Sequence, residues 1–354
     1  MRRTIHSARL LAPAVACLGL FLLVHAARAQ VSAIDDIATY AGADRAERLN
    51  AGGRKEGVLT LYSSARSDDL AALAAAFEAR YRIKVRVWRA SSEVILSRVI
   101  NESRGGRFDA DVVETAGPDL SALARERLLQ PISSPVFADL DKSARVPGRA
   151  WIASRYSVLV AAYNTKLVAA ADLPKQYSDL LDFKWRGRLG IEADDAPWLA
   201  TVVTALGERA GLDLFRGIAS RNGVSLRKGH SLLANLVVSG EVPFALTVYG
   251  YHVDQLKRAG APIEKVYLAP VVVVPTGIGV LRKAPHPFAA ILFADFMLSD
   301  GQAILAARDH VVTNRRHGGL PADLSVAFVG SSKYLDERDK WTRLFRDVFI
   351  ERRR

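Results

Sequence analysis

Apolar and polar residues in the first half of the chain alternate in a pattern that predicts strands followed by helices. Three short runs, either apolar or alternating apolar with polar, are typical of strands, and each precedes apolar residues at helical spacing. The predicted strands are Val58–Tyr62, Lys84–Trp88 and Ala110–Glu114, and the predicted helices are 68–80, 92–102 and 118–127. This order predicts a largely parallel, doubly wound α/β sheet.

The second half of the chain repeats this alternation. The predicted strands are 157–164, 188–191, 244–247 and 266–274, and the predicted helices are 196–208, 212–220, 232–239, 253–259, 288–298, 301–307 and 336–350. Two apolar runs, Ser157–Asn164 and Val272–Val280, connect the two sets of units, so we expect two crossovers between two lobes. A double crossing makes a hinge and leaves a cleft where strand ends from both lobes face each other.

The first 29 residues have the pattern of a secretory signal peptide. Its parts are the positive residues Arg2, Arg3 and Arg9, the apolar run Leu10–Val24, and the small-x-small cleavage site Ala27-Arg28-Ala29. An uncleaved anchor is the alternative, but the apolar run is short for a membrane span. We therefore expect a mature chain that starts near Gln30, with a polar leader at 30–53 that is helical from Ala33 to Ala51.

Length, charge and cysteine content narrow the class of protein. A chain of 354 residues is long for one hydrophobic core, which predicts two domains. The formal charge of +12 falls to about +8 without the four arginines of the signal, and the bases are scattered, so no nucleic-acid partner is expected. The single cysteine, Cys17, lies in the signal, which excludes a disulfide and a thiol nucleophile from the mature chain.

The stretch VLTLYSSAR combines a buried strand with a small polar turn. Ser63, Ser64 and Arg66 form the turn, and a helix is predicted to begin directly after it. A helix N-terminus points free N–H groups and its positive dipole beyond the strand ends, which favours an anion. The alternative is that Ser67 only caps the helix and that Arg66 is solvated.

Other polar residues follow predicted strands or precede predicted helices. Glu114 and Thr115 close a buried strand, Ser91 or Ser92 precedes a helix, and Tyr249 and Tyr251 share one side of a strand end. For the tyrosines, the alternative is a pair of packing aromatic residues whose hydroxyls have partners.

Several further residues have a structural and a functional interpretation. Asp195 either caps the helix that contains Pro197 or reaches the cleft. Arg155 either binds a carboxylate or phosphate or forms an interlobe salt bridge. We expect His230 and His252 on the surface and Trp198 in the core.

The chain resembles the periplasmic solute-binding proteins of ABC importers, in particular the ferric-iron-binding class within solute-binding protein family 1. The stretches that carry the resemblance are LTLYSSAR, FEARYRIKVRVWRASS, FDADVVE, VAAYNTKL, FKWRGRLGI, GEVPFALTVYGY and VPTGIGVLRKAPHPFAAILFADFMLSDGQAIL. They cover almost all of the mature chain. The resemblance implies a type II periplasmic-binding-protein fold, in which two lobes with doubly wound mixed sheets close over a ligand about two hinge crossovers.

Most of the iron ligands of that class are not reproduced at their own positions in this sequence. The class has a His where this chain has Arg66, a Glu where it has Ala116, and adjacent tyrosines where it has Gly250-Tyr251. Its anion-holding Ser-Gly-Ala turn falls on Asp195, Ala196 and Pro197. An arginine cannot bind a metal. The resemblance therefore implies the fold of the class but not its iron ligand, and the identity of the ligand has to be inferred from the residues present.

We therefore predict a periplasmic, monomeric, non-enzymatic protein that captures a small ligand in the cleft by hinge closure and delivers it to an ABC permease. The ligand is predicted to be an anionic or zwitterionic organic solute or an iron chelate, with no cofactor and no bound metal of its own. The predicted ligand-binding residues are Ser63, Ser64, Arg66, Ser92, Glu114, Thr115, Asp195, Tyr249 and Tyr251. The predicted N-lobe is 54–157 with 275–320, and the predicted C-lobe is 158–274 with 321–354.

Three alternatives remain open. In the first, Fe³⁺ is the transported ligand and is bound by Glu114, Tyr249 and Tyr251, because phenolate and carboxylate oxygens suit a hard trivalent ion. In the second, the protein presents its ligand to a membrane sensor instead of a permease. A periplasmic enzyme is the third, but the sequence has no Ser-His-Asp order, H-E-x-x-H or G-x-S-x-G motif.

Overall fold

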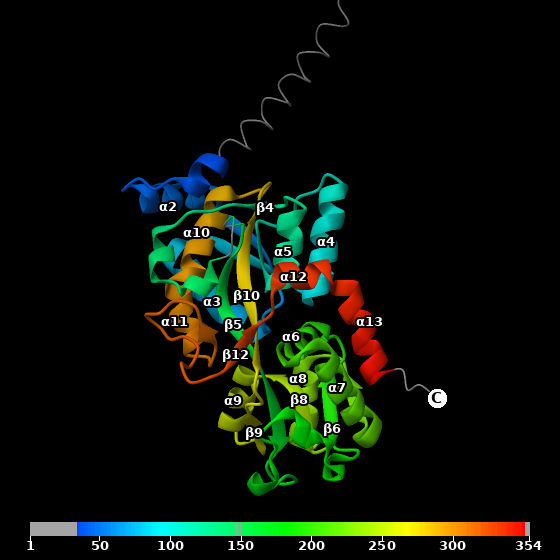
Figure 1. Cartoon of the computed structure of the whole chain (residues 1–354). Helices are drawn as coiled ribbons and strands as arrows, with labels where there is room; N and C mark the ends of the chain where they lie inside the picture. The colour runs from blue at the N-terminus through cyan, green and yellow to red at the C-terminus, as the bar shows by residue number, and fades with distance from the viewer. Residues whose placement is uncertain (1–33, 146–147, 149, 351–354) are drawn as a thin grey trace, which may run out of the picture.

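The computed structural model describes residues 34–145, 148 and 150–350, and the predicted signal peptide lies outside them. These residues form two lobes joined by long strands (Figure 1). We call N-lobe the part whose buried apolar residues lie in 34–153 and 278–312. We call C-lobe the part whose buried apolar residues lie in 156–273 and 329–349.

The N-lobe sheet places the ends of three parallel strands at one edge. Strand β1 (Val58–Ser63) pairs in parallel with β2 (Lys84–Arg89) and with β3 (Val112–Ala116). The register sets Ser63 directly beside Glu114 at this edge. Strand β10 (Val271–Leu281) completes the sheet antiparallel to β3 and also pairs with the short β4, Leu129–Gln130.

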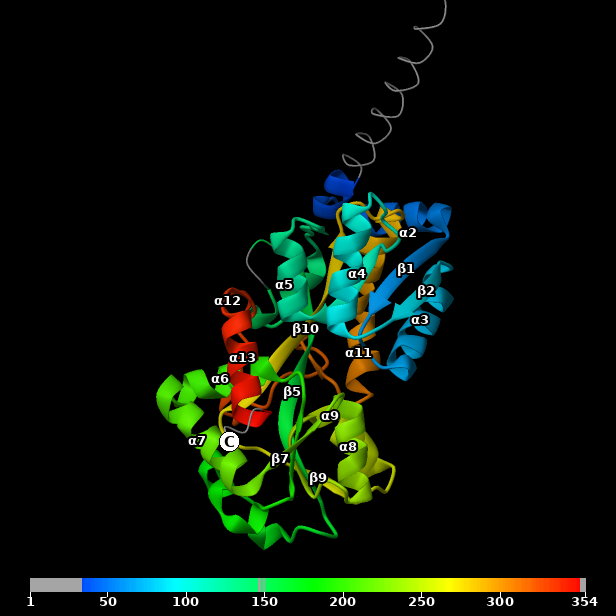
Figure 2. The same cartoon turned by 90° about the vertical axis from the view of Figure 1, so that its right-hand side faces the viewer.

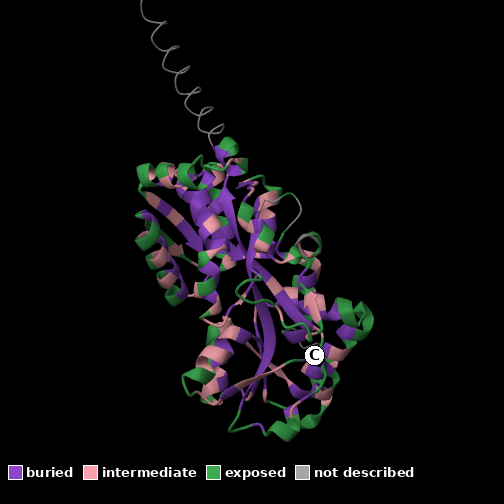
Figure 3. Ribbon diagram, turned by 90° about the vertical axis from the view of Figure 1, so that its left-hand side faces the viewer, coloured by how far each residue is buried: buried purple, intermediate pink, exposed green. Residues whose placement is uncertain are grey.

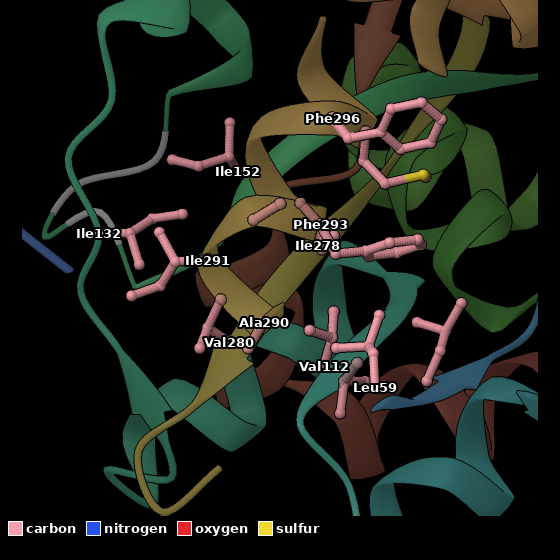
Figure 4. Packing of buried hydrophobic residues seen from close by; sticks show 14 of the residues in the cluster. Leu59, Val112, Ile132, Ile152, Ile278, Val280, Ala290, Ile291, Phe293 and Phe296 are labelled. Carbon is pink, nitrogen blue, oxygen red and sulfur yellow. The ribbon is translucent and has the colours of Figure 1, made fainter. Parts of the chain in front are cut away.

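The N-lobe helices cover this sheet with aromatic and aliphatic side chains. They are α2 (Arg45–Glu56), α3 (Ser67–Tyr81), α4 (Ser92–Arg104), α5 (Gly117–Arg125), α10 (Pro287–Leu298) and α11 (Asp300–Ala306). The ring of Phe77 on α3 lies 5.0 Å from that of Phe293 and 5.4 Å from that of Phe296, both on α10. Figure 4 shows part of this cluster, including Leu59 of β1 and Val112 of β3.

Two long strands run through both lobes and form the hinge. Strand β5 (Ile152–Asn164) and β10 are antiparallel neighbours from Val272↔Leu159 to Ile278↔Ile152. The far half of β5 pairs with C-lobe strands, whereas the far half of β10 pairs with β3 of the N-lobe. All thirteen residues of β5 are buried, and the strand is the continuous purple ribbon between the lobes in Figure 3. These strands confirm the two predicted crossovers.

The C-lobe sheet has the same mixed character. Strand β8 (Phe244–Tyr249) is antiparallel to β5 and parallel to β6 (Leu189–Glu192), which is in turn parallel to β7 (Val224–Arg227). Strand β9 (Ile263–Val266) pairs with β5. The C-lobe helices are α6 (Ala196–Leu206), α7 (Glu208–Asn222), α8 (His230–Ser239) and α9 (Gly250–Arg258). The pairing of β10 with β5 joins the strands of both lobes into one mixed sheet with helices between its strands, which agrees with the predicted two-lobed α/β fold class.

Short elements complete the two lobes. They are the 3₁₀ helices η1 (Pro135–Asp139), η2 (Lys142–Ala144), η4 (Ala170–Asp172), η5 (Tyr177–Leu181) and η6 (Phe183–Trp185), and the strand β11 (Val311–Val312), which pairs with β5.

The end of the described chain crosses from one lobe to the other. Strand β12 (Val326–Phe328) pairs with β10, α12 (Ser331–Asp336) contacts α5 of the N-lobe, and α13 (Arg338–Phe349) packs on α6 and α7 of the C-lobe. Figures 1 and 2 both show this red segment running along one side of the molecule. It connects the lobes a third time.

Several predicted elements differ from the structure. The predicted leader helix from 33 to 51 is two helices, at 34–39 and in α2, with a break between them. The predicted strand at 266–274 is wrong at its start, because a turn and the cis Ala269-Pro270 bond separate β9 from β10. Strand β7 was not predicted, because its alternation of apolar and polar residues extends over only four residues, and of β9 only the last residue, Val266, lay in a predicted strand. The predicted last helix is interrupted at Glu337, between α12 and α13.

Within residues 34–145, 148 and 150–350, no single helix is long and apolar enough to cross a membrane, although α10 and α11, bent by 48° at their junction, meet the length and composition together.

We expect Gly277→Ala to destabilise the protein by about 1–3 kcal/mol, the usual range for forcing an atom into a filled interior. A Cβ atom at Gly277 would lie 2.3 Å from the carbonyl oxygen of Ile152, on the hinge strand β5, where the β5–β10 register shifts. Gly319→Ala is the control, because a Cβ atom there meets nothing within 4 Å. Equal urea denaturation midpoints for the two variants would contradict the prediction.

Candidate functional site

The turn after β1 forms the N-lobe side of the candidate site. The Ser63 hydroxyl donates a hydrogen bond to Glu114 and accepts one from the Ala65 N–H at 3.0 Å, while the Ser64 N–H donates to the Glu114 carbonyl oxygen at 3.1 Å. These bonds fix the turn against the end of β3. The strand register, which pairs Ser63 with Glu114, brings these candidate residues together.

Arg66 occupies the position just before α3. It is the N-cap residue, in an extended conformation, and Ser67 is the first helical residue, so the alternative in which Ser67 caps the helix is wrong. The Arg66 side chain is 30 % exposed and lies 3.5 Å from Asp68, but its Nε atom is buried and has no hydrogen-bond partner in the described part of the chain. Arg66 is therefore not simply a solvated cation.

Glu114 and Arg155 form a buried ion pair beside this turn. Glu114 Oε1 lies 2.5 Å from Arg155 Nη1, and the two residues are 1 % and 5 % exposed. The predicted salt bridge of Arg155 exists, although its partner lies on β3 of the N-lobe and the pair does not bridge the lobes. Thr115 is also buried, and its hydroxyl oxygen has no hydrogen-bond partner among the described residues.

The start of α4 lies next to the same turn. The Ala90 N–H donates to the Ser63 carbonyl oxygen at 3.2 Å, and Arg89 Nε donates to the Ala65 carbonyl oxygen at 2.6 Å. Ser91 is the N-cap of α4, and Ser92 is its half-buried first residue. Two helix N-termini, those of α3 and α4, therefore begin close to the Ser63–Arg66 turn.

Asp69, in the first turn of α3, is a buried carboxylate that the sequence analysis missed. It is 1 % exposed and bonds to Arg308 and, at 2.8 Å, to His310 Nε2. Burial opposes ionisation, but the hydrogen bonds from His310 and Arg308 prevail and lower the pKa of Asp69 to about 2. Asp69 thus connects α3 to the segment that leads into β11, the short strand that pairs with the hinge strand β5.

Tyr249 and Tyr251 bring the C-lobe to these N-lobe residues. Tyr249 is the last residue of β8 and Tyr251 lies in the first turn of α9, so the prediction that both lie on a strand end is wrong. Their rings nevertheless stack, with centroids 5.7 Å apart and 14° between the planes. The ring of Tyr251 lies 4.2 Å from that of His310.

The electrostatic surroundings of the two tyrosines differ. Burial raises the pKa of both phenols. For Tyr249, the negative charges of Asp195 and Glu192 add to the increase in pKa, whereas for Tyr251 the positive charges of Arg155 and Arg66 oppose it. Tyr251 therefore lies where the two arginines act, and Tyr249 lies beside the carboxylates of the C-lobe.

Those carboxylates belong to a group at the ends of the C-lobe strands. Asp195, the N-cap of α6, is 7 % exposed, and burial raises its pKa to about 7. It occupies the N-cap position, as one of the two interpretations predicted, but its side chain makes no capping hydrogen bond. Glu192 ends β6, and the His230 ring lies 4.1 Å from that of Tyr249.

The prediction that His230 and His252 are surface residues is wrong. His252 is buried, and burial together with the charge of Arg66 lowers its pKa to about 4. His230 is mostly buried between Tyr249 and Asp195. The sequence contained a signal that His230 lies at a helix start near the cleft, because it follows Gly229 directly before a predicted helix. Trp198 is buried, as predicted.

Two hollows occur elsewhere in the molecule. One of about 50 Å³ lies behind Tyr251 and is also lined by Tyr156 and Val160. The other, of about 490 Å³, lies between α2 and α10 at Tyr40 and Phe288. Neither is lined by the predicted anion-binding residues of the N-lobe.

Comparison with known proteins gives one family and several structural relatives. Residues 64–304 match the family described as bacterial extracellular solute-binding protein, a family of binding proteins and not of enzymes. The chain is 28 % identical to iron uptake protein A1 of Synechocystis sp. over 296 residues, which are 78 % of this chain and 80 % of that protein.

Solved structures share the two-lobed fold. Iron-bound HitA from Pseudomonas aeruginosa is 26 % identical with a TM-score of 0.72, and the match covers 82 % of this chain and 99 % of that one. The periplasmic binding protein AfuA from Actinobacillus pleuropneumoniae, with fructose-6-phosphate bound, is 23 % identical with a TM-score of 0.73, and the match covers 83 % and 99 %. These likenesses confirm the type II periplasmic-binding-protein fold.

We expect Asp69→Asn to lower the free energy of unfolding at neutral pH by about 2 kcal/mol. The pKa of Asp69 falls from 3.8 to about 2 on folding, and each pKa unit corresponds to roughly 1.4 kcal/mol. The folded-state pKa lies below the unfolded value, so this contribution is present above about pH 4 and disappears as the pH falls toward about 2. Urea denaturation across this range measures the effect.

Asp68→Asn, one residue earlier and exposed, is the control for Asp69→Asn. We expect its stability to follow that of the native protein at every pH. A difference between native protein and Asp69→Asn that stays constant from neutral pH to about pH 2 contradicts the prediction.

Proposed function

Because the chain belongs to the bacterial extracellular solute-binding proteins, we propose that it captures an anionic or zwitterionic organic solute, or an anionic iron chelate, between its lobes. An ABC permease in the inner membrane then receives the solute. A membrane sensor in place of the permease is compatible with the same binding step.

The observation that supports an anionic ligand is the state of Arg66. Its guanidinium stands at the N-terminus of α3 with a buried Nε that has no hydrogen-bond partner within the described chain. A buried donor without a partner costs free energy, and an oxygen of a bound carboxylate or phosphate would satisfy it. The helix dipole and the first N–H groups of α3 attract the same negative charge.

The remaining predicted residues have defined tasks in this proposal. Ser63 and Glu114 hold the turn in shape, and Ser64, Ser92 and Thr115 offer hydroxyls beside it. Tyr249 and Tyr251 present flat rings to the body of the ligand. Asp195 accepts a cationic or hydroxyl group from the C-lobe side, since a buried carboxylate oxygen without a partner is a strong acceptor.

Closure of the lobes follows from where these groups lie. The anion-binding turn belongs to the N-lobe and Asp195 to the C-lobe, while β5 and β10 connect the two. A ligand that touches both lobes binds the closed form more tightly than the open form and shifts the population toward it. The division into 54–157 with 275–320 and 158–274 with 321–354 is part of this proposal.

The proposal includes export and cleavage. The predicted signal peptide, residues 1–29, would direct the chain to the periplasm, where relatives such as the Fe(3+)-binding periplasmic protein of Serratia marcescens act. The mature protein is proposed to be a monomer, with no nucleic-acid partner.

Ferric iron is the second candidate ligand, and two observations favour it. Relatives carry names that refer to iron, and the stacked Tyr249 and Tyr251 lie beside Glu114 and Asp195 in a region rich in oxygen ligands. Against it, Glu114 is already paired with Arg155, and Arg66 stands where the resembling class has a histidine ligand. We therefore rank free Fe³⁺ below an anion.

Arg66→Ala is expected to weaken binding of the anionic ligand by about tenfold to hundredfold, since a charge-assisted hydrogen bond contributes roughly 1.5–3 kcal/mol. A thermal-shift panel of phosphate, citrate, hexose phosphates, amino acids and ferric citrate identifies the ligand, because binding raises the melting temperature. Calorimetry then compares the affinities of the native protein and the variant.

Arg86→Ala is the matched control, because Arg86 is an exposed arginine on the edge strand β2. We expect it to bind the ligand as the native protein does. If Arg66→Ala and Arg86→Ala bind equally well, or if no compound in the panel raises the melting temperature, the anion proposal is wrong.

Ferric iron without a chelator is expected to produce no tyrosinate absorption in the visible range. The phenols of Tyr249 and Tyr251 have raised pKa values and stay protonated unless a metal displaces the proton. Visible absorption that appears on adding Fe³⁺ and disappears in Tyr249→Phe or Tyr251→Phe would replace the anion proposal with the iron one.

A further inference from the structure

Three side chains that can bind a metal meet at one edge of the C-lobe sheet. Glu192 ends β6, Asp195 precedes α6, and His230 begins α8. One ligand atom from each lies within 4.8 Å of the others. The strands β6, β7 and β8 are parallel, so the group lies at their common carboxyl end, where ligands bind in sheets of this kind.

Glu192 is held in place by backbone groups from two loops. Its Oε1 accepts a hydrogen bond from the Gly229 N–H at 2.8 Å, and its Oε2 accepts one from the Asp194 N–H at 2.6 Å. Gly229 has a φ of 105°, a conformation that side chains rarely adopt, which allows its N–H to reach the carboxylate. Each carboxylate oxygen accepts two bonds, so one position on each oxygen stays available.

The orientation of His230 is fixed by a neighbouring carbonyl group. Its Nδ1 lies 3.4 Å from the carbonyl oxygen of Thr247. A carbonyl oxygen only accepts hydrogen bonds, so a proton on Nδ1 satisfies this contact, and a metal ion at the site would take the place of any proton on Nε2. That Nε2 atom faces Asp195 Oδ1 at 3.4 Å. A histidine held in this way by a carbonyl is the usual support for a metal ligand.

Asp195 provides an independent sign of a missing partner. The residue is 7 % exposed, and its Oδ2 atom has no hydrogen-bond partner anywhere in the described chain. Lys228, a nearby cation, is exposed and lies 3.7 Å from Asp194, the neighbouring carboxylate, instead. Asp195, Glu192 and His230 thus turn acceptor atoms toward one another in a buried place, an arrangement that a cation would stabilise.

We propose that Glu192, Asp195 and His230 bind a divalent transition-metal ion, with Zn²⁺ as the best match. One imidazole nitrogen and two carboxylate oxygens suit Zn²⁺, and a fourth position stays open for water or for an oxygen of the transported solute. The site uses no N-lobe residue and does not involve Arg66, but it shares Asp195 with the proposed solute site, so this part of the inference rests on the proposed function. The sequence prediction had assigned no metal to the protein.

The test is metal binding by the whole mature protein in the absence of any organic ligand. Calorimetry with Zn²⁺ is expected to show one site, and Co²⁺ is expected to give the visible absorption of a low-coordinate complex that Zn²⁺ abolishes. Asp195→Asn and His230→Gln are each expected to weaken binding by more than about tenfold, since loss of even a supporting contact has an effect of that size.

Two variants separate this site from its surroundings. Asp194→Asn removes the adjacent exposed carboxylate and keeps the backbone N–H that holds Glu192, so native Zn²⁺ affinity is expected. Arg66→Ala is expected to leave Zn²⁺ binding unchanged even though it disrupts the anion site. Melting temperatures of all variants without metal show whether each one is folded.

The result that overturns the proposal is equally direct. Absence of stoichiometric binding of Zn²⁺ and Co²⁺ to the native protein ends it. Binding that Asp195→Asn and His230→Gln leave unchanged also ends it, because the metal then lies elsewhere. X-ray anomalous scattering at the zinc edge locates the ion directly, and density between Glu192, Asp195 and His230 supports the proposal.

Discussion

The antiparallel pairing of β5 with β10 is the constraint on which the rest of the structure depends. Each strand begins in one lobe and ends in the other, and their common segment is buried along its length. Three residues of the candidate site take their positions from this pair: Arg155 lies on β5, Glu114 on the strand beside β10, and Tyr249 on the strand beside β5. The lobes can therefore move only by twisting or bending these two strands.

The buried Glu114–Arg155 pair lies at the N-lobe end of that hinge. Either charge alone at this depth would strongly destabilise the fold, and the attraction between the two offsets the cost of removing each from water. The pair also leaves Arg66 as a cation whose Nε has no partner among the described residues, because the carboxylate beside the turn is already used. Because the Glu114–Arg155 pair neutralises the carboxylate beside the Ser63–Arg66 turn, the positive charge of Arg66 is left to attract an anion.

Much of this arrangement was predictable from the sequence, and the failures have physical causes. Strands β1 and β3 were predicted within two residues of their observed ends, Ser63 and Ala116, because apolar runs and polar turns are local signals. Asp69 and His310 were missed because their contact joins residues 241 positions apart, which no local pattern encodes. His230 was assigned to the surface because that is the default for a histidine outside a motif, and its burial comes from contacts with Tyr249 and Asp195, which are distant in the sequence. The contact between Tyr249 and Tyr251 was predicted from strand geometry but arises at a strand-to-helix junction.

The segment from β12 to α13 gives the hinge a property that two strands alone lack. Asp336 of α12 is 2.7 Å from Arg125 of the N-lobe, while Trp341 and Phe345 of α13 are buried in the C-lobe core. Only the short break at Glu337 separates these two anchors. Any motion that separates the lobes must therefore bend this segment at Glu337 or break one of its two anchors.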